Sequence, residues 1–105
     1  MDPIETLRVI HFDASRTVLA ITQYRGARTR VILPLRAIIA DALTLGTVGL
    51  LLSHNHPSGD ATPSRNDIAA TRQLARAADA LGIRLHDHIV SADGHSVSFR
   101  ATGLL

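Results

Sequence analysis

The apolar run Val48-Gly49-Leu50-Leu51-Leu52 leads directly into Ser53-His54-Asn55-His56. The run does not alternate apolar and polar residues, which is the pattern of a strand buried on both faces. Such a strand lies inside a sheet, and helices have to cover that sheet on both sides. The sequence therefore predicts an α/β fold in which two imidazoles follow a buried strand.

The segments before this run predict three strands and one helix. β-rich stretches at 7–12 and 17–24 are separated by a short turn and indicate a hairpin, and residues 31–33 indicate another short strand. Pro34 suits the first turn of a helix that ends at Gly46. The apolar stripe of this helix is formed by Ile38, Ile39, Ala42 and Leu45.

The segments after the run predict a second helix and two more strands. The loop 54–63 contains two prolines and a glycine, and a helix is expected from Ser64 to about Leu81. Strands are expected at 83–90 and 96–100, with a hairpin turn at the Asp-Gly pair between them. The resulting order, β-β-β-α-β-α-β-β, predicts a mixed sheet flanked by helices on both faces.

Size and hydropathy indicate one globular unit. The chain has 105 residues, of which 46% are hydrophobic and 19% are charged, so a single domain spanning residues 1–105 is expected. No apolar run approaches the ~18–20 residues of a membrane span, and the first residues lack the basic and apolar regions of a signal peptide. We therefore expect a soluble, cytoplasmic protein.

Composition limits the chemistry of any site. The chain has no cysteine, which excludes disulfides, thiolate nucleophiles and iron–sulfur centres. Any metal has to be held by histidines and carboxylates, and Glu5 is the only glutamate. The net charge of +2 permits nucleic-acid binding but does not indicate it.

A metal site is predicted where the buried strand ends. His54 and His56 are two residues apart in an extended backbone, so both imidazoles point the same way and can converge on one ion. Asp67, Leu74 and Leu81 are spaced by seven residues, and because the leucines should face the core, Asp67 should face it too. Two histidines and one carboxylate are the protein ligands of a catalytic zinc, which keeps a fourth position for water.

The segments 53–60 and 63–67, with the later pair Asp87-His88, resemble the RadC group of the JAB/MPN metalloprotease superfamily. The JAMM signature of that superfamily, H-x-H-x7-S-x2-D, is met at every specified position by His54, His56, Ser64 and Asp67. The resemblance covers essentially the whole chain. It implies the JAB/MPN fold, a cytidine-deaminase-like mixed sheet flanked by helices on both faces.

The resemblance also implies a role for each site residue. His54, His56 and Asp67 are implied as Zn²⁺ ligands. Glu5 opens a stretch similar to the first strand of RadC-like domains, so it is implied as the general base, and Ser64 as the group that stabilises the oxyanion. The implied activity is a zinc-dependent metallopeptidase or isopeptidase. Because the chain has no lysine, an isopeptide-linked substrate would have to come from another chain.

Two patterns have an alternative structural interpretation. Ser64-x-x-Asp67 is also typical of a capping box at a helix start, and Asp67 cannot give its whole carboxylate to the cap and still bind zinc. His86 and His88 form a second His-x-His, but no carboxylate follows at a matching interval, so internal packing is favoured. The remaining histidines predicted at the surface or in turns are His11 and His95.

Two other functions remain open at this point. One is a non-catalytic MPN-type scaffold that keeps a zinc site and binds a protein or nucleic acid, which is expected if Glu5, so near the start of the chain, is mobile. The other is a DNA-repair-associated RadC-like protein. Arg25, Arg28 and Arg30 could form a patch for an acidic partner, although a solvated loop is favoured. A homodimer is also a reasonable expectation for so small a domain.

Overall fold

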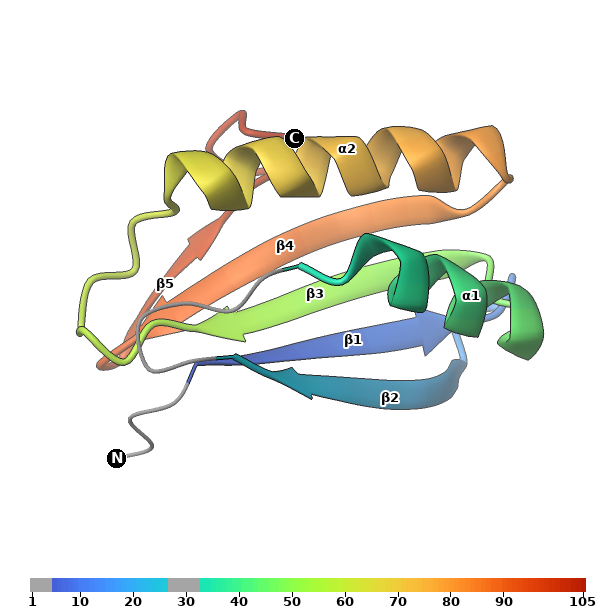
Figure 1. Ribbon diagram of the computed structural model, residues 1–105, viewed down its shortest axis with the longest axis horizontal. Helices are drawn as coiled ribbons and strands as arrows, with labels where there is room; N and C mark the ends of the chain where they lie inside the picture. The colour runs from blue at the N-terminus through green and yellow to red at the C-terminus, as the bar shows by residue number, and fades with distance from the viewer. Residues whose placement is uncertain (1–4, 27–32) are drawn as a thin grey trace.

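The computed structural model describes residues 5–26 and 33–105, and these segments form five strands and two helices (Figure 1). Residues 31 and 32 of the predicted third strand lie outside the described residues, as do Arg28 and Arg30. The other predicted elements are all present. In chain order they are β1 (Thr6–Phe12), β2 (Val18–Arg25), α1 (Leu35–Leu45), β3 (Gly49–Asn55), α2 (Arg65–Ala80), β4 (Arg84–Ala92) and β5 (His95–Ser98).

The sheet is mixed, which confirms the predicted fold class. Its strand order is β2-β1-β3-β4-β5. β1 runs antiparallel to β2 and β3, β4 runs antiparallel to β5, and β3 and β4 are parallel. A parallel pair needs a crossover connection, which α2 supplies. Because parallel strands end at the same edge of a sheet, the loop after β3 and the turn after β4 lie next to each other.

Both helices pack on the same face of the sheet, which corrects the predicted arrangement on two faces. Figure 1 shows α2 running along β4 and α1 lying over β3 and β1. Leu7 pairs with His54 and Val9 with Leu52, so these side chains share one face. One buried cluster joins that face to both helices. It includes Leu7, Val9, Leu50 and Leu52 from the sheet, Ile38 and Ala42 from α1, and Leu74 and Ala78 from α2.

The opposite face of the sheet is covered mainly by its own side chains. Leu51 is only half-buried there, and the rings of Phe12 and His86 meet edge to face with centroids 6.0 Å apart. The His86 ring lies against Gly49, where a Cβ would collide with Nε2 of the ring. The unbroken apolar run was therefore a misleading signal, because one of its two faces is shielded by rings and carries no described helix.

The ends of the helices agree closely with the sequence. α1 ends at Gly46, which adopts the left-handed conformation that favours glycine (φ 72°). α2 begins after the N-cap Ser64 and ends before Leu81. Leu81 was predicted to face the core, but as the C-cap residue it is 50% exposed. Among the described residues, neither helix is both long and apolar enough to cross a membrane.

His11 was predicted at the surface, and this prediction is wrong. Its side chain is fully buried because it lies two residues after Val9 in β1 and therefore points to the same helix-covered face. Nδ1 lies 2.9 Å from Oγ1 of Thr47, and Nε2 lies 3.4 Å from Oγ1 of Thr22. Burial lowers the pKa of His11, with Asp41 acting weakly in the other direction. His95 is exposed, as predicted.

Candidate metal centre

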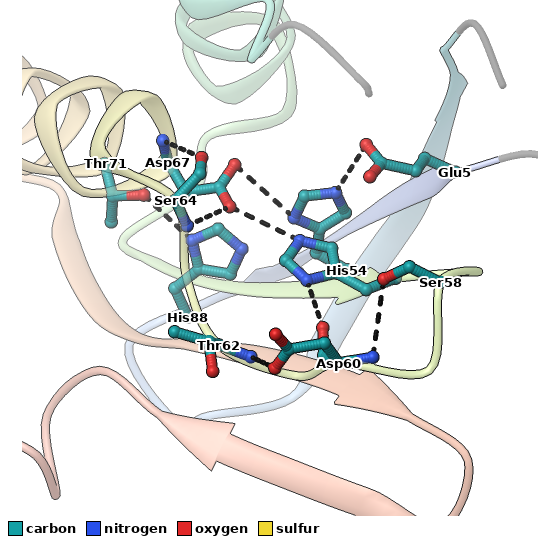
Figure 2. A network of polar contacts seen from close by, with 10 residues as sticks. Glu5, His54, Ser58, Asp60, Thr62, Ser64, Asp67, Thr71 and His88 are labelled. Atoms are coloured by element: carbon teal, nitrogen blue, oxygen red, sulfur yellow. Dashed lines mark hydrogen bonds and ion pairs between the residues drawn. The ribbon is translucent and has the colours of Figure 1, made fainter. Parts of the chain in front are cut away.

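The predicted site residues meet at the end of β3. His54 is near the last residue of that strand, His56 follows it, and Asp67 lies in the first turn of α2. Glu5 precedes β1, whose Leu7 pairs with His54, so the antiparallel β1–β3 pair brings Glu5 beside the histidines. Figure 2 shows Glu5 and Asp67 approaching the histidines from opposite sides. Segments far apart in the sequence therefore build one polar cluster.

His54 lies between two carboxylates. Its Nε2 is 3.3 Å from Oε2 of Glu5, and its Nδ1 is 4.0 Å from Oδ1 of Asp67. The side chain is 2% exposed, and Nδ1 is buried with no hydrogen-bond partner among the described residues. A buried nitrogen without a partner destabilises the folded state. A ligand at Nδ1 would remove that penalty.

His56 has the orientation that a metal ligand needs. Its Nδ1 lies 2.8 Å from the main-chain oxygen of Asp60, and because a carbonyl only accepts, Nδ1 carries a proton and donates it. In a neutral ring Nε2 then presents its lone pair, 3.3 Å from Oδ2 of Asp67. Two acceptors at that separation need a cation between them, either a proton or a metal ion.

The loop after His56 holds the oxygen that His56 contacts. The carboxylate of Asp60 accepts hydrogen bonds from Thr62, whose backbone nitrogen lies 2.9 Å away, and these bonds lower the pKa of Asp60. Gly59 has a φ of 86°, and a Cβ there would come within 2.8 Å of Oδ2 of Asp93 in the β4–β5 turn. The loop can approach this turn closely because residue 59 has no side chain.

Glu5 is buried and its backbone is held by hydrogen bonds, which does not meet the condition under which a scaffold was favoured, a mobile Glu5. Its side chain is buried, with 7% of the residue exposed. Its carbonyl oxygen accepts a hydrogen bond from the nitrogen of Gly26 at 3.0 Å, and the next nitrogen, of Thr6, donates to Oδ1 of Asn55 at 2.6 Å. The sequence did not predict this role for Asn55, which alternates with the two histidines and ties the start of β1 to the end of β3.

The capping box predicted at Ser64 and Asp67 is present. Oγ of Ser64 accepts from the nitrogen of Asp67 at 3.0 Å, and Oδ2 of Asp67 accepts from the nitrogen of Ser64 at 2.9 Å. The second carboxylate oxygen, Oδ1, takes no part in the cap and faces His54. A capping box and a metal ligand are therefore compatible interpretations of Ser64-x-x-Asp67, because the cap uses Oδ2 of Asp67 and leaves Oδ1 available to a ligand.

The donor set fits a divalent transition metal. One ligand atom each from Glu5, His54 and His56 lies within 4.8 Å of the other two. Ligand atoms around a tetrahedral zinc lie roughly 3.3 Å apart, so pairs of these atoms would have to approach by up to about 1.5 Å. Imidazole and carboxylate ligands without thiolate suit zinc and its neighbours in the first transition row. The assignment of Asp67 as the third ligand, and of Glu5 and Ser64 as acting on the substrate, stays a prediction.

His88 lies next to this cluster, and the sequence did not predict its role. It is 1% exposed, and its ring stacks on that of His54 with centroids 5.6 Å apart. Its Nδ1 lies 2.8 Å from Oγ1 of Thr71, whereas its Nε2 is buried with no partner among the described residues. Burial, and then the charge of His54, lower the pKa of His88 to about 4. Thr71 is one helical turn after Asp67 in α2, so it lies on the same side of the helix. This spacing is the feature of the sequence that could have placed Thr71 near the site.

The sequence of the chain matches known proteins over almost its whole length. The family model of the RadC-like JAB domain matches residues 1–104. The chain is 47% identical over 104 residues to a UPF0758 protein of Rhodobacter capsulatus, covering 98% of this chain and 49% of the relative. It is 41% identical over 102 residues to a UPF0758 protein of Ruegeria pomeroyi, covering 96% of this chain and 46% of that relative. The chain thus spans about half the length of these relatives.

Proposed function

Because the chain belongs to the family of RadC-like JAB domains, we propose that it is a zinc-dependent hydrolase that cleaves an amide bond of a protein or peptide. In this proposal His54, His56 and Asp67 bind the zinc, and Glu5 is the general base. An isopeptide-linked substrate would have to come from another chain, since these 105 residues contain no lysine.

One observation carries the proposal: two carboxylates surround two histidines whose nitrogens are poised for a cation. Nδ1 of His54 is buried without a partner, and Nε2 of His56 presents a lone pair 3.3 Å from Oδ2 of Asp67. The main-chain bond from Nδ1 of His56 to Asp60 fixes the protonated nitrogen on the side away from the cluster. A purely structural pair of buried histidines would satisfy these nitrogens with protein groups.

Each residue has a distinct task in amide hydrolysis. A bound zinc supplies a water of pKa ~7 and polarises the substrate carbonyl. The carboxylate of Glu5 would take a proton from the attacking water and return it to the amine nitrogen as the C–N bond breaks. The hydroxyl of Ser64 accepts from the helix backbone through its oxygen, so its proton remains to be donated to the oxyanion. The products are a carboxylic acid, which ionises by releasing a proton to water, and an amine.

A groove next to His56 has room for the substrate. It has a volume of about 400 Å³ and lies between the loop after β3 and the β4–β5 turn. Because β3 and β4 are parallel, both walls rise from the same edge of the sheet as the histidines. The residues that line it are Asn55, His56, Pro57, Ser91, Ala92, Asp93, Gly94, His95 and Ser96.

Metal content and turnover test the proposal separately. After dialysis against zinc-containing buffer, the wild-type protein is expected to hold one zinc, and His54→Ala and Asp67→Ala to hold none. Glu5→Gln should keep the zinc and lose amide hydrolysis by about 100-fold or more, because a general base contributes about that factor. Zinc is measured by mass spectrometry of the metal, and hydrolysis by mass spectrometry of a pool of peptides and isopeptide-linked peptides.

Two variants serve as controls, because each removes a side chain of the same type, a histidine or an aspartate, at a position outside the cluster. His95→Ala and Asp79→Ala change exposed residues and should keep full zinc. Full zinc in both His54→Ala and Asp67→Ala would contradict the site. Equal hydrolysis by Glu5→Gln and the wild type would contradict the role of Glu5. Zinc binding with no turnover of any peptide in either form would favour a scaffold that binds its partner without cleaving it.

A further inference from the structure

We propose that His88, held by Thr71, is a positioning residue that sets the ring orientation of His54 in the metal centre. This inference rests on the proposed function in one respect, namely that His54 binds the metal. It concerns a different pair of residues, which contact no substrate and are joined to the cluster through the stacked rings of His88 and His54.

The ring of His54 needs such support. Its Nδ1 has no hydrogen-bond partner among the described residues, and its Nε2 faces the single oxygen Oε2 of Glu5 at 3.3 Å. Two ring contacts define its plane. The ring of His56 is nearly perpendicular to it, with centroids 4.8 Å apart and an angle of 85°, and the ring of His88 is nearly parallel, at 5.6 Å and 26°. Since His56 is itself a predicted ligand, His88 is the ring that can fix His54 independently of the metal.

His88 is anchored at two points. Its Nδ1 lies 2.8 Å from Oγ1 of Thr71 in α2, and its ring stacks on Phe99 with centroids 4.5 Å apart. Phe99 is held in turn by the bond from its own nitrogen to the carbonyl of His88, at 3.0 Å. The ring of His88 therefore cannot turn without breaking its bond to α2, the helix whose first turn carries Asp67.

Asp87 completes the support from the opposite face of β4. Its Oδ1 accepts from the nitrogens of His88 and Arg100, and its Oδ2 accepts from Oγ of Ser98 at 2.5 Å. Burial tends to raise the pKa of Asp87, but these hydrogen bonds outweigh it and the pKa is lowered. Because Ser98 and Arg100 flank Phe99, the carboxylate of Asp87 holds Phe99 against His88. The adjacent residues Asp87 and His88 thus act together, one on each face of the strand.

Packing alone does not account for a histidine at position 88. A phenylalanine of nearly the same shape would stack on His54 and Phe99 without burying a nitrogen, and Nε2 of His88 is buried without a partner. An unpaired buried nitrogen costs stability, and the polar contact that histidine offers in return is the one from Nδ1 to Thr71. If the Thr71 hydroxyl donates to Nδ1, the proton of the neutral ring is on Nε2.

Two substitutions remove the contact between Thr71 and His88 from either side. Thr71→Val keeps the shape of the side chain and removes its hydroxyl, and His88→Phe keeps the stacking and removes both nitrogens. Cobalt is the probe, because the visible spectrum of cobalt reports ligand geometry. We expect cobalt affinity to fall about 10- to 100-fold in both variants, the range typical of partners that orient metal ligands. The cobalt spectrum should change in both.

The metal-free protein supplies a second readout. Long-range ¹H–¹⁵N spectra of the imidazoles should show His88 with its proton on Nε2 in the wild type, and should show shifted nitrogen signals of His54 in both variants. The matched control is His11→Phe, which removes the other buried histidine that contacts a threonine. It should leave cobalt affinity and the His54 signals unchanged. Amide spectra of each variant establish that it is folded.

The outcomes distinguish the two proposals. Unchanged His54 signals in both variants, together with unchanged cobalt affinity, would overturn the role of His88. A loss of cobalt affinity in His11→Phe equal to that in His88→Phe would also overturn it, because the effect would then be general destabilisation. If the wild type binds no cobalt, the proposed function fails, while the His54 signals of the metal-free protein still decide whether His88 orients that ring.

Discussion

The helix-covered face of the sheet buries histidines at both of its ends, and the hydrogen bonding of the two ends differs. At one end His11 has a threonine hydroxyl near each ring nitrogen, at 2.9 Å and 3.4 Å. At the other end Nδ1 of His54 and Nε2 of His88 are buried without partners among the described residues. We refer to these as the His11 end and the His54 end. The register separates them by four residues along β1 and β3, roughly 13 Å.

The contrast shows that burial of a histidine does not by itself indicate a functional site. Both ends lie on one sheet face, and both contain a ring whose Nδ1 contacts a threonine, His11 with Thr47 and His88 with Thr71. What differs is whether the protein satisfies every nitrogen. At the His11 end it does, so that ring stabilises the fold. At the His54 end it does not, and two carboxylates lie close to the ring of His54.

Zinc should stabilise the protein through the His54 end alone. At free zinc about 1,000 times its Kd, binding to the folded state adds about 4 kcal/mol to the free energy of unfolding. We expect this gain in the wild type and in His11→Phe, and its loss in His54→Ala. Urea unfolding with and without zinc measures it. A full gain in His54→Ala, or none in His11→Phe, would break the distinction between the two ends.

The pH dependence of stability should be dominated by the His54 end in metal-free protein. The pKa of His88 is lowered from 6.5 to about 4, so below pH 6.5 the unfolded chain binds a proton that the folded protein does not. Stability is therefore full above about pH 6.5 and falls towards pH 4, by about 3 kcal/mol in total from this residue. Urea unfolding in the presence of a chelator measures the decline.

The two buried histidines can be compared in the same pH series. His88→Phe should flatten the decline strongly. His11→Phe should flatten it less, because the nearby charge of Asp41 counteracts part of the lowering of the His11 pKa by burial. A steeper decline in His88→Phe than in the wild type would contradict the assignment of the low pKa to His88.

The smallest effect is expected from the hydroxyl at the His11 end. Thr47→Val leaves Nδ1 of His11 without its partner, and a buried polar group that loses its partner costs about 2 kcal/mol of stability. Zinc affinity should not change, in contrast to Thr71→Val, where affinity and stability should both fall. Thermal unfolding and a zinc titration of the two variants provide the comparison. A weaker zinc affinity in Thr47→Val would mean that the two ends are coupled.

Much of the candidate site could be predicted from local spacing. The alternation of side chains along a strand placed His54 and His56 together, and their ring centroids are 4.8 Å apart. The helix period placed Asp67 towards them, although Leu81, part of the same argument, is exposed. Glu5 could not be placed by spacing, because its position depends on the pairing of β1 with β3. The resemblance to RadC-like domains supplied that residue.

The features that the sequence did not predict depend on tertiary packing. Whether helices cover one face of the sheet or two is decided by how α1 and α2 share a core. The apolar run containing Leu51 does not indicate how many faces are covered. The burial of His11 follows from which residues of β1 point to that core. The contact between Thr71 and His88 joins residues 17 apart in the chain. In each case the missing information is which face of an element meets which neighbour.

The distance along the chain between Glu5 and His54, 49 residues, has a consequence for the order of events when the protein is made. β1 can pair with β3 only after β3 has been synthesised, and such non-local pairings form slowly in folding because a long loop has to close first. The full cluster of carboxylates and imidazoles therefore requires β1 to be paired with β3 and the first turn of α2 to be in place. A cation that requires all of these groups would therefore bind the folded domain in preference to a chain in which β1 and β3 have not yet paired.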